Sequence, residues 1–239
     1  MSDRAASDRG ASDDASLESF RLADSFLPVG TYTVSYALEG FIADDRVEDV
    51  TDLEEILETY LRRQVGPADL VALRAAHAAA REGDLEAALA ADRRLTAATL
   101  PAEFRESARK SGRRLLSLQR DLREEPLLER YAERIEAEEA EGTYPVVLGV
   151  ATGLAGVDER EACLLSCHGF ATGMLGAAQR LLSLGHTDAQ RVLDGLRPAM
   201  RDAVDDSANR TIEDMTPFAP LVDVVSAEHE RADRRLFVS

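Results

Sequence analysis

Cys163, Cys167 and His168 are the reactive side chains that stand closest together in this chain of 239 residues. On a helix, thiols four residues apart face the same side, and the imidazole of His168 follows directly. Zinc binds thiolates and imidazoles, but such a site usually needs four converging ligands. Because an apolar stretch follows the three residues, we favour two small buried cysteines and keep metal binding as an alternative.

The sequence lacks the motifs of the common enzyme classes. Its single lysine, Lys110, lies in Arg-Lys-Ser, whereas a phosphate-binding loop needs Gly-Lys followed by Ser or Thr. No GxGxxG, HExxH or GxSxG motif occurs. The acidic run 136–141 is more simply a solvated helix face in a chain with 45 acidic residues. We therefore predict a binding protein without a cofactor or metal of its own, and not an enzyme.

The charge of the chain argues against several classes of partner. With Lys+Arg 28 and Asp+Glu 45, the formal net charge is −17, so the surface repels nucleic acid and anionic membranes. Excess carboxylate with almost no lysine is typical of a cytosol that holds molar salt, where screening removes the self-repulsion. Two cysteines make no disulfide framework, and no apolar stretch approaches the roughly 18–20 residues of a membrane span. We expect a cytoplasmic protein.

The spacing of apolar residues predicts an all-α bundle. Leu53, Leu57 and Leu61 recur on one helix face, Thr51 with Glu54 would cap its start, and the Gly-Pro pair at 66–67 would end it. Pro198 is expected to kink or split the last long helix. The other helices are predicted over residues 70–81, 84–94, 101–118, 127–135, 158–182 and from 187 onward.

Composition divides the chain into three parts. Residues 1–16 contain no large apolar side chain apart from the initial methionine, which predicts a disordered acidic tail. Residues 17–214 would form the single all-helical domain. Residues 215–239 form a C-terminal tail in which Pro217 and Pro220 argue against a regular helix.

Two segments repeat the same pattern of small residues. Gly149-Val-Ala-Thr-Gly153 and Gly169-Phe-Ala-Thr-Gly173 each place two glycines on one helix face. Since glycine costs about 1 kcal/mol relative to alanine inside a helix, the pattern indicates that two backbones approach closely. Tight core packing and a subunit interface both explain it.

Four motifs, in order along residues 17–239, resemble the UreF family of urease accessory proteins. Residues 27–39, LPVGTYTVSYALE, are similar to that family's LPxGxFSYSxGLE signature, with Val34 and Ala37 as departures. The middle resembles it through RE at 105–106 and GRRLL at 112–116. Residues 145–193 are similar to its PVxxG run and its LGQTDGQR block, and the tail to its HE followed by RLFxS.

The resemblance implies a non-enzymatic, dimeric, all-helical chaperone. Such a protein would link apo-urease, through a UreD/UreH-type partner, to the nickel-carrying GTPase UreG. The segment 28–39 and the C-terminal tail would bind the UreD-type subunit, and the glycine-faced helix 169–180 would lie near the dimer or GTPase surface. The implied partner-binding residues are Pro28, Gly30, Tyr32, Ser35, Tyr36, Glu39, Arg180, His229, Glu230, Arg235, Leu236 and Phe237.

A second reading within the same family makes the chain a regulator of GTP hydrolysis in its UreG partner. An arginine inserted in trans accelerates phosphoryl transfer about 10³–10⁵-fold, and Arg180 or Arg191 could supply it.

Overall fold

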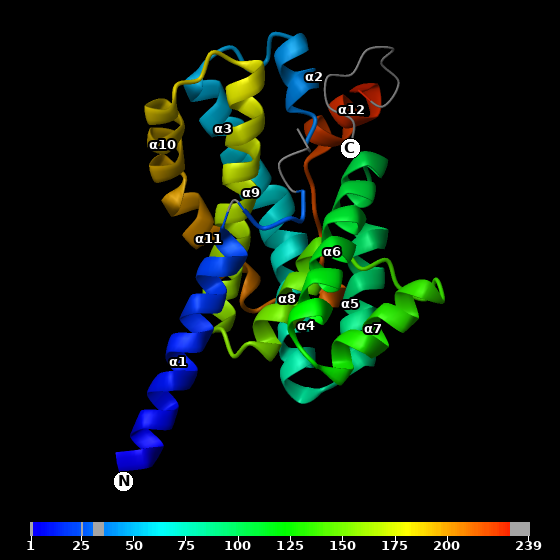
Figure 1. Ribbon diagram of the computed structural model, residues 1–239. Coiled ribbons are helices and arrows are strands. Elements are labelled where there is room, and N and C mark those ends of the chain that lie inside the picture. The colour runs from blue at the N-terminus through cyan, green and yellow to red at the C-terminus, as the bar shows by residue number, and fades with distance from the viewer. Residues whose placement is uncertain (1, 25, 31–35, 230–239) are drawn as a thin grey trace.

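The computed structural model describes residues 2–24, 26–30 and 36–229, and over this part of the chain every regular element is a helix (Figure 1). The all-α prediction is thus confirmed. The elements are α1 (Ser2–Ala23), α2 (Leu38–Ala43), α3 (Val50–Tyr60), the π-helix η2 (Leu61–Asp69), α4 (Leu70–Glu82), α5 (Leu85–Ala98), α6 (Ala102–Leu122), α7 (Pro126–Glu136), α8 (Tyr144–Leu154), α9 (Glu159–Leu181), α10 (His186–Gly195), α11 (Arg197–Ser207), the 3-10 turn η3 (Ile212–Asp214) and α12 (Pro220–His229).

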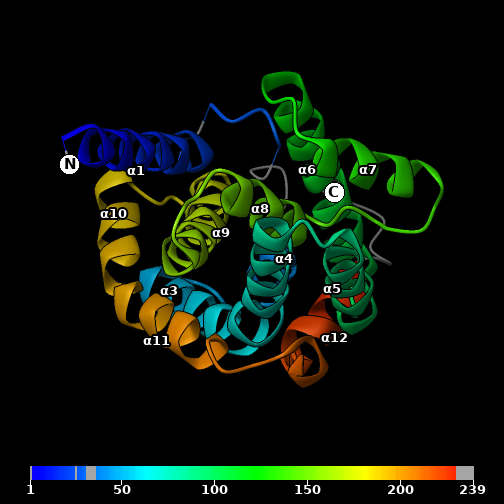
Figure 2. The same cartoon turned by 90° about the horizontal axis from the view of Figure 1, so that it is seen from below.

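Helix α4 lies at the centre of the bundle, with α5, α8, α9 and η2 packed around it (Figure 2). Its closest neighbour is α8, which is buried on all faces from Pro145 to Gly153. A Cβ atom added at Gly149 would overlap the carbonyl oxygen of Leu73, and one added at Gly153 would lie 2.6 Å from that of His77. The first glycine repeat is therefore explained by tight core packing between two helix backbones.

The second glycine repeat differs from the first at Gly169. A Cβ atom at Gly169 or Gly176 on α9 would meet no heavy atom within 4 Å. Thus the same small-residue pattern packs two helices together in α8 and leaves open space beside α9. For the second repeat, the subunit-interface interpretation stays a prediction.

The expected helix stop at 66–67 is wrong. The chain passes from α3 through the π-helix η2 directly into α4, and the N–H of Leu70 bonds to the carbonyl of Val65, five residues earlier. The wider π turn accommodates Pro67, which lacks an N–H and would clash in a regular α-helix. The cap of α3 also differs from the prediction, because Asp49, not Thr51, accepts N–H bonds from Thr51 and Asp52 at 2.7 and 3.1 Å.

Both chain ends are more helical than expected. Residues 2–16 belong to α1, whereas we predicted disorder; alanines at several of these positions favour helix even without large apolar side chains. In the C-terminal segment, Pro220 starts α12, which is compatible with helix because a first-turn residue needs no N–H partner. The division of the chain at residues 17 and 214 remains a prediction.

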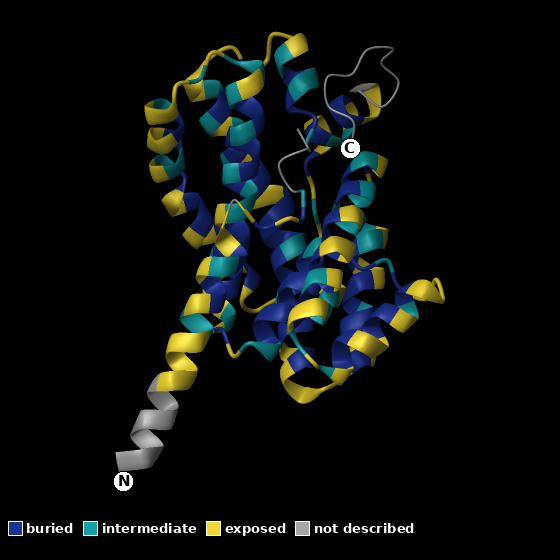
Figure 3. Ribbon diagram, in the orientation of Figure 1, coloured by how far each residue is buried: buried dark blue, intermediate teal, exposed yellow. Residues whose placement is uncertain are grey.

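Burial follows the layers of the bundle: the faces turned to α4 and α8 are buried, and exposed residues lie on the outside and along α1 (Figure 3). Near the end of α1, Glu18 is only 7% exposed and its carboxylate pairs with Arg123 at 2.9 Å, which ties α1 to the end of α6. No helix within the described ranges combines the length and apolarity that a membrane crossing requires.

Two polar side chains hold the inner helices in place. Asp92 on α5 is fully buried and accepts N–H bonds from Glu141, Gly142 and Thr143 at 2.8–2.9 Å, which fixes the loop that starts α8. Arg74 on α4 donates to Ser207 and to the carbonyl of Val204 on α11, and it pairs with Glu159 on α9. Each side chain thereby joins elements far apart in the sequence.

The two glycine repeats offer a matched test of this packing. We expect Gly149→Ala to destabilise the fold by about 1–3 kcal/mol, because its methyl group forces α8 away from α4. Gly169→Ala is the control: its methyl group meets nothing, and we expect a gain of up to about 1 kcal/mol from helix propensity. Urea denaturation followed by far-UV circular dichroism measures both, and equal effects of the two changes would contradict the packing described here.

Candidate functional site

Three stretches that the sequence analysis singled out meet around α2. This short helix carries Glu39 and contacts α9, which ends beside Arg180, and α12, which begins the C-terminal tail (Figure 1). The structure therefore brings the N-terminal motif, the end of α9 and the start of the tail to one end of the molecule. Tyr32, Ser35, Glu230, Arg235, Leu236 and Phe237 lie outside the described residues, and His229 is described only as the last residue of α12.

The turn at 27–30 is anchored in the core. Leu27 and Val29 are buried, the N–H of Val29 bonds to the carbonyl of Leu27 at 2.8 Å, and Pro28 between them is exposed. Gly30 has a φ of 75°, and a Cβ there would overlap the Arg114 guanidinium on α6. The glycine is thus required by the backbone, while Pro28 is the member of this motif that a partner could touch.

Tyr36 and Ala37 both adopt the left-handed region, with φ of 46° and 62°. For residues with a side chain this conformation costs roughly 1–2 kcal/mol each, so the surrounding structure must hold it. The Tyr60 hydroxyl donates to the Tyr36 carbonyl, and the Tyr36 ring packs against Phe104 and Phe170 with centroid distances of 5.1 Å to each. A glycine at 37, as in the family signature, would relieve part of this strain.

Beneath Tyr36 lies a cavity of about 80 Å³ between η2, α6, α8 and α9. Its lining combines the aromatic side chains with polar groups that include Gln64, Ser111 and Ser166, and with the carboxylate of Asp69 at the end of η2. Burial away from bulk water raises the pKa of Asp69 to about 7. Nearby, burial and the Asp69 charge raise the pKa of the Tyr36 phenol above its usual value.

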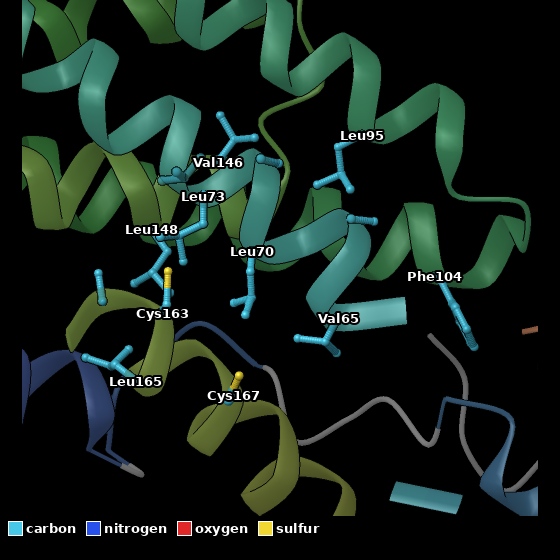
Figure 4. Packing of buried hydrophobic residues seen from close by; sticks show 14 of the residues in the cluster. Val65, Leu70, Leu73, Leu95, Phe104, Val146, Leu148, Cys163, Leu165 and Cys167 are labelled. Atoms are coloured by element: carbon cyan, nitrogen blue, oxygen red, sulfur yellow. The ribbon is translucent and has the colours of Figure 1, made fainter. Parts of the chain in front are cut away.

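The two cysteines do not favour a metal centre. Cys163 and Cys167 are fully buried on α9, and their sulfur atoms lie among the apolar side chains of the core (Figure 4). Burial raises the pKa of the Cys163 thiol to about 12 and that of Cys167 still further, so neither is a thiolate near neutral pH. His168 is exposed and turns from the pair, and within the described part of the chain no three metal-binding side chains gather.

The arginines considered for a role on a GTPase lie on the surface. Arg180 is exposed at the end of α9, and its Nε donates to the carbonyl of Gly176 at 3.1 Å. Arg191 on α10 is 73% exposed and pairs with Asp188 at 2.6 Å. Neither reaches the cavity under Tyr36.

The sequence alone did not predict the role of Asp69 or the left-handed backbone of Tyr36 and Ala37. Asp69 follows Gly-Pro-Ala in an ordinary-looking loop, and only the fold shows that it faces a cavity. The left-handed backbone at 37 had a signal, because the UreF signature has glycine where this chain has alanine.

Comparisons with known proteins agree on one family. A family model described as UreF matches residues 47–197. The urease accessory protein UreF of Trichodesmium erythraeum is 33% identical over 219 residues, which are 92% of this chain and 94% of that protein. UreF 1 of Brucella melitensis biotype 1 is 34% identical over 93% of this chain and 92% of its own length, and UreF of Photorhabdus laumondii is 34% identical over 91% and 95%.

The carboxylate in the cavity predicts a pH-dependent loss of stability. The folded pKa of Asp69 lies above the unfolded value of about 3.9, so the folded state binds the proton more tightly. The stability that comes from protonated Asp69 is fully present below about pH 4 and is lost as pH rises to about 7. The free energy of unfolding of Asp69→Asn should therefore equal that of the wild type in acid. At pH 8 it should be higher than that of the wild type, by up to about 4 kcal/mol.

Thermal and urea unfolding across this pH range measures the difference between the two proteins. Asp121→Asn, which removes an exposed carboxylate at the end of α6, is the control with the same net charge. A wild type and an Asp69→Asn variant whose stabilities stay parallel from pH 4 to 8 would show that Asp69 is not the group described.

Proposed function

The chain belongs to the UreF family of urease accessory proteins, and from this membership we propose that it is a non-enzymatic scaffold in urease maturation. The scaffold binds a UreD/UreH-type protein and a UreG-type GTPase and so joins them to apo-urease for nickel insertion. Nickel is the cargo of this assembly, and no three metal-binding side chains gather within the described residues to hold it. The working compartment is the cytoplasm.

The observation that supports this proposal most is the gathering of three separate stretches around α2. In an enzyme, the reactive side chains usually gather in one pocket. Here the three segments instead meet at the surface, at one end of a helical bundle. Beside them, α12 and the segment just before it expose apolar side chains: Phe218 before the helix is 71% exposed, and Leu221 and Val224 on it are 46% and 54% exposed. Exposed apolar residues that cluster in this way are typical of protein interaction sites. We assign the UreD-type partner to this end of the molecule.

The second proposed surface is a homodimer contact along α1 and α9. Leu17 is 63% exposed and Phe20 is 70% exposed on α1. Between α1 and α9 runs a groove of about 250 Å³ lined by Phe20, Leu164 and His168 among others. Removing such exposed apolar side chains from water by packing them against another protein surface is favourable in free energy. A second copy of the chain, seated on this groove, would cover the exposed side chains of Leu17 and Phe20.

The C-terminal tail offers the test of the scaffold function. Deleting residues 229–239 should abolish co-purification with a UreD-type protein and leave far-UV ellipticity nearly unchanged, because it removes only the last residue of the described helices, His229 of α12. Within the tail, Leu236→Ser with Phe237→Ser should weaken binding, and Arg231→Ala with Asp233→Ala is the control. In cells that lack the protein, only the wild type and the control should restore urease activity. If the truncated chain restores urease activity, the tail does not bind the UreD-type partner as proposed.

The dimer contact is tested at Phe20. We expect Phe20→Asp to convert a dimer to a monomer in size-exclusion chromatography with light scattering, because a carboxylate cannot enter an apolar interface unpaired. Leu122→Asp is the control, since Leu122 is 56% exposed at the far end of α6. A dimer that survives Phe20→Asp, or dissociates equally with Leu122→Asp, would place the contact elsewhere.

A further inference from the structure

The cavity under Tyr36 holds a carboxyl group, that of Asp69, which has no ion-pair partner in the described part of the chain. Asp69 faces the cavity, and none of the described Lys, Arg or His side chains forms an ion pair with it. Arg105 at the cavity wall is engaged otherwise: its Nη1 donates to the carbonyls of Thr99 and Leu100 at 2.8 and 2.6 Å. The titratable groups around Asp69 are the phenols of Tyr36 and Tyr144 and the thiol of Cys167, which add no positive charge.

The wall of the same cavity is aromatic. Tyr36, Tyr60, Phe104 and Phe170 form one cluster, with ring centroids between 5.1 and 6.4 Å apart. They come from the N-terminal motif, α3, α6 and α9, so four separate parts of the chain supply this wall. Aromatic faces attract cations through their quadrupole, and the attraction is strongest where water is excluded.

We propose that this cavity binds a monovalent nitrogen cation, an alkylammonium or guanidinium group, between the carboxylate of Asp69 and the aromatic wall formed by Tyr36, Tyr60, Phe104 and Phe170. Gln64 and Ser166 supply oxygen atoms that accept N–H bonds from such a group. This inference goes beyond the scaffold function, and its test does not depend on the test of that function.

The size and donor set of the cavity select this class of ligand. A volume of about 80 Å³ has room for a group of about five non-hydrogen atoms, counting roughly 15 Å³ for each. A divalent metal would require several oxygen, nitrogen or sulfur ligands, whereas this site offers one carboxylate and a wall of rings. The thiol of Cys167 stays protonated because burial raises its pKa, so it adds no thiolate.

A nitrogen cation of this size has two sources. It exists as a free small molecule, and it exists as the end of a lysine or arginine side chain presented by a polypeptide. Methylguanidinium represents the first source, and N-acetyl-arginine amide represents the second. Binding of the small cation alone identifies a site for free amines or guanidines, and binding of both identifies a site that also accepts a side chain; either result supports the proposal.

The chain carries its own spectroscopic reporter. It has no tryptophan and five tyrosines, and Tyr36, Tyr60 and Tyr144 line the cavity. Tyrosine emission of the full chain is followed while methylguanidinium chloride is added at constant ionic strength. Methylurea, which has nearly the same shape without the charge, is the matched control ligand. We expect a saturable change with methylguanidinium and none with methylurea.

Two variants test the assignment to these residues. Asp69→Asn should weaken binding by about 10-fold or more, because it removes the only carboxylate that lines the described cavity. Phe170→Leu keeps the charge and removes one ring, and we expect it to weaken binding several-fold. Asp121→Asn, with its exposed carboxylate, should bind as the wild type does. Thermal unfolding in acid shows that each variant is folded before it is titrated.

Three results would overturn the proposal. Equal responses to methylguanidinium and methylurea would show that charge plays no part. Undiminished binding by Asp69→Asn would place the cation elsewhere. A response to Ni²⁺ that depends on Asp69, with none to methylguanidinium, would make the cavity a metal site instead.

Discussion

The close approach of α8 to α4 is the constraint on which the rest of this structure depends. Gly149 and Gly153 let the two backbones approach closely. Helix α4 also contacts η2, α5, α9 and α11, so it is the central helix of the bundle. Hydrogen bonds from Asp92 to the loop before α8, and from Arg74 to α11, connect the surrounding elements to one another. With these positions set, the ends of η2, α6, α8 and α9 leave the cavity between them.

The end of the bundle around α2 is built differently from its centre. At the centre, α4 and α8 are regular α-helices, whereas Tyr36 and Ala37 adopt the left-handed region, and a hydrogen bond from Tyr60 and ring contacts hold Tyr36 there. Segments that take part in binding are often the least stable parts of a fold. Here a conformationally costly segment lies between the rigid core and the surface that we assign to a partner.

Much of the fold could be predicted from the sequence, and two of the failures, the Gly-Pro stop and Asp69, share one cause. Gly83 ends α4 in the left-handed region, Asp158 caps α9, and the chain divides between α10 and α11 next to Pro198, all as local rules predict. The Gly-Pro stop was wrong because the chain continues as a π-helix, and its neighbour α11 is distant in the sequence. Asp69 was missed for the same reason, since its surroundings come from helices α6, α8 and α9 that are distant in the sequence. Of the predicted partner-binding residues, Gly30 and Tyr36 have positive φ values of 75° and 46°, and their role in binding stays a prediction.

The single lysine has a practical consequence for mapping the assembly. Lys110 lies on α6 with its side chain 48% exposed, 3.5 Å from a Glu106 oxygen. Apart from the α-amino group at the start of the chain, it is the one primary amine of the protein. An amine-directed cross-linker or label therefore attaches at a single internal point, and any partner covalently captured there can be assigned to the α6 side of the bundle without sequencing the cross-linked peptide.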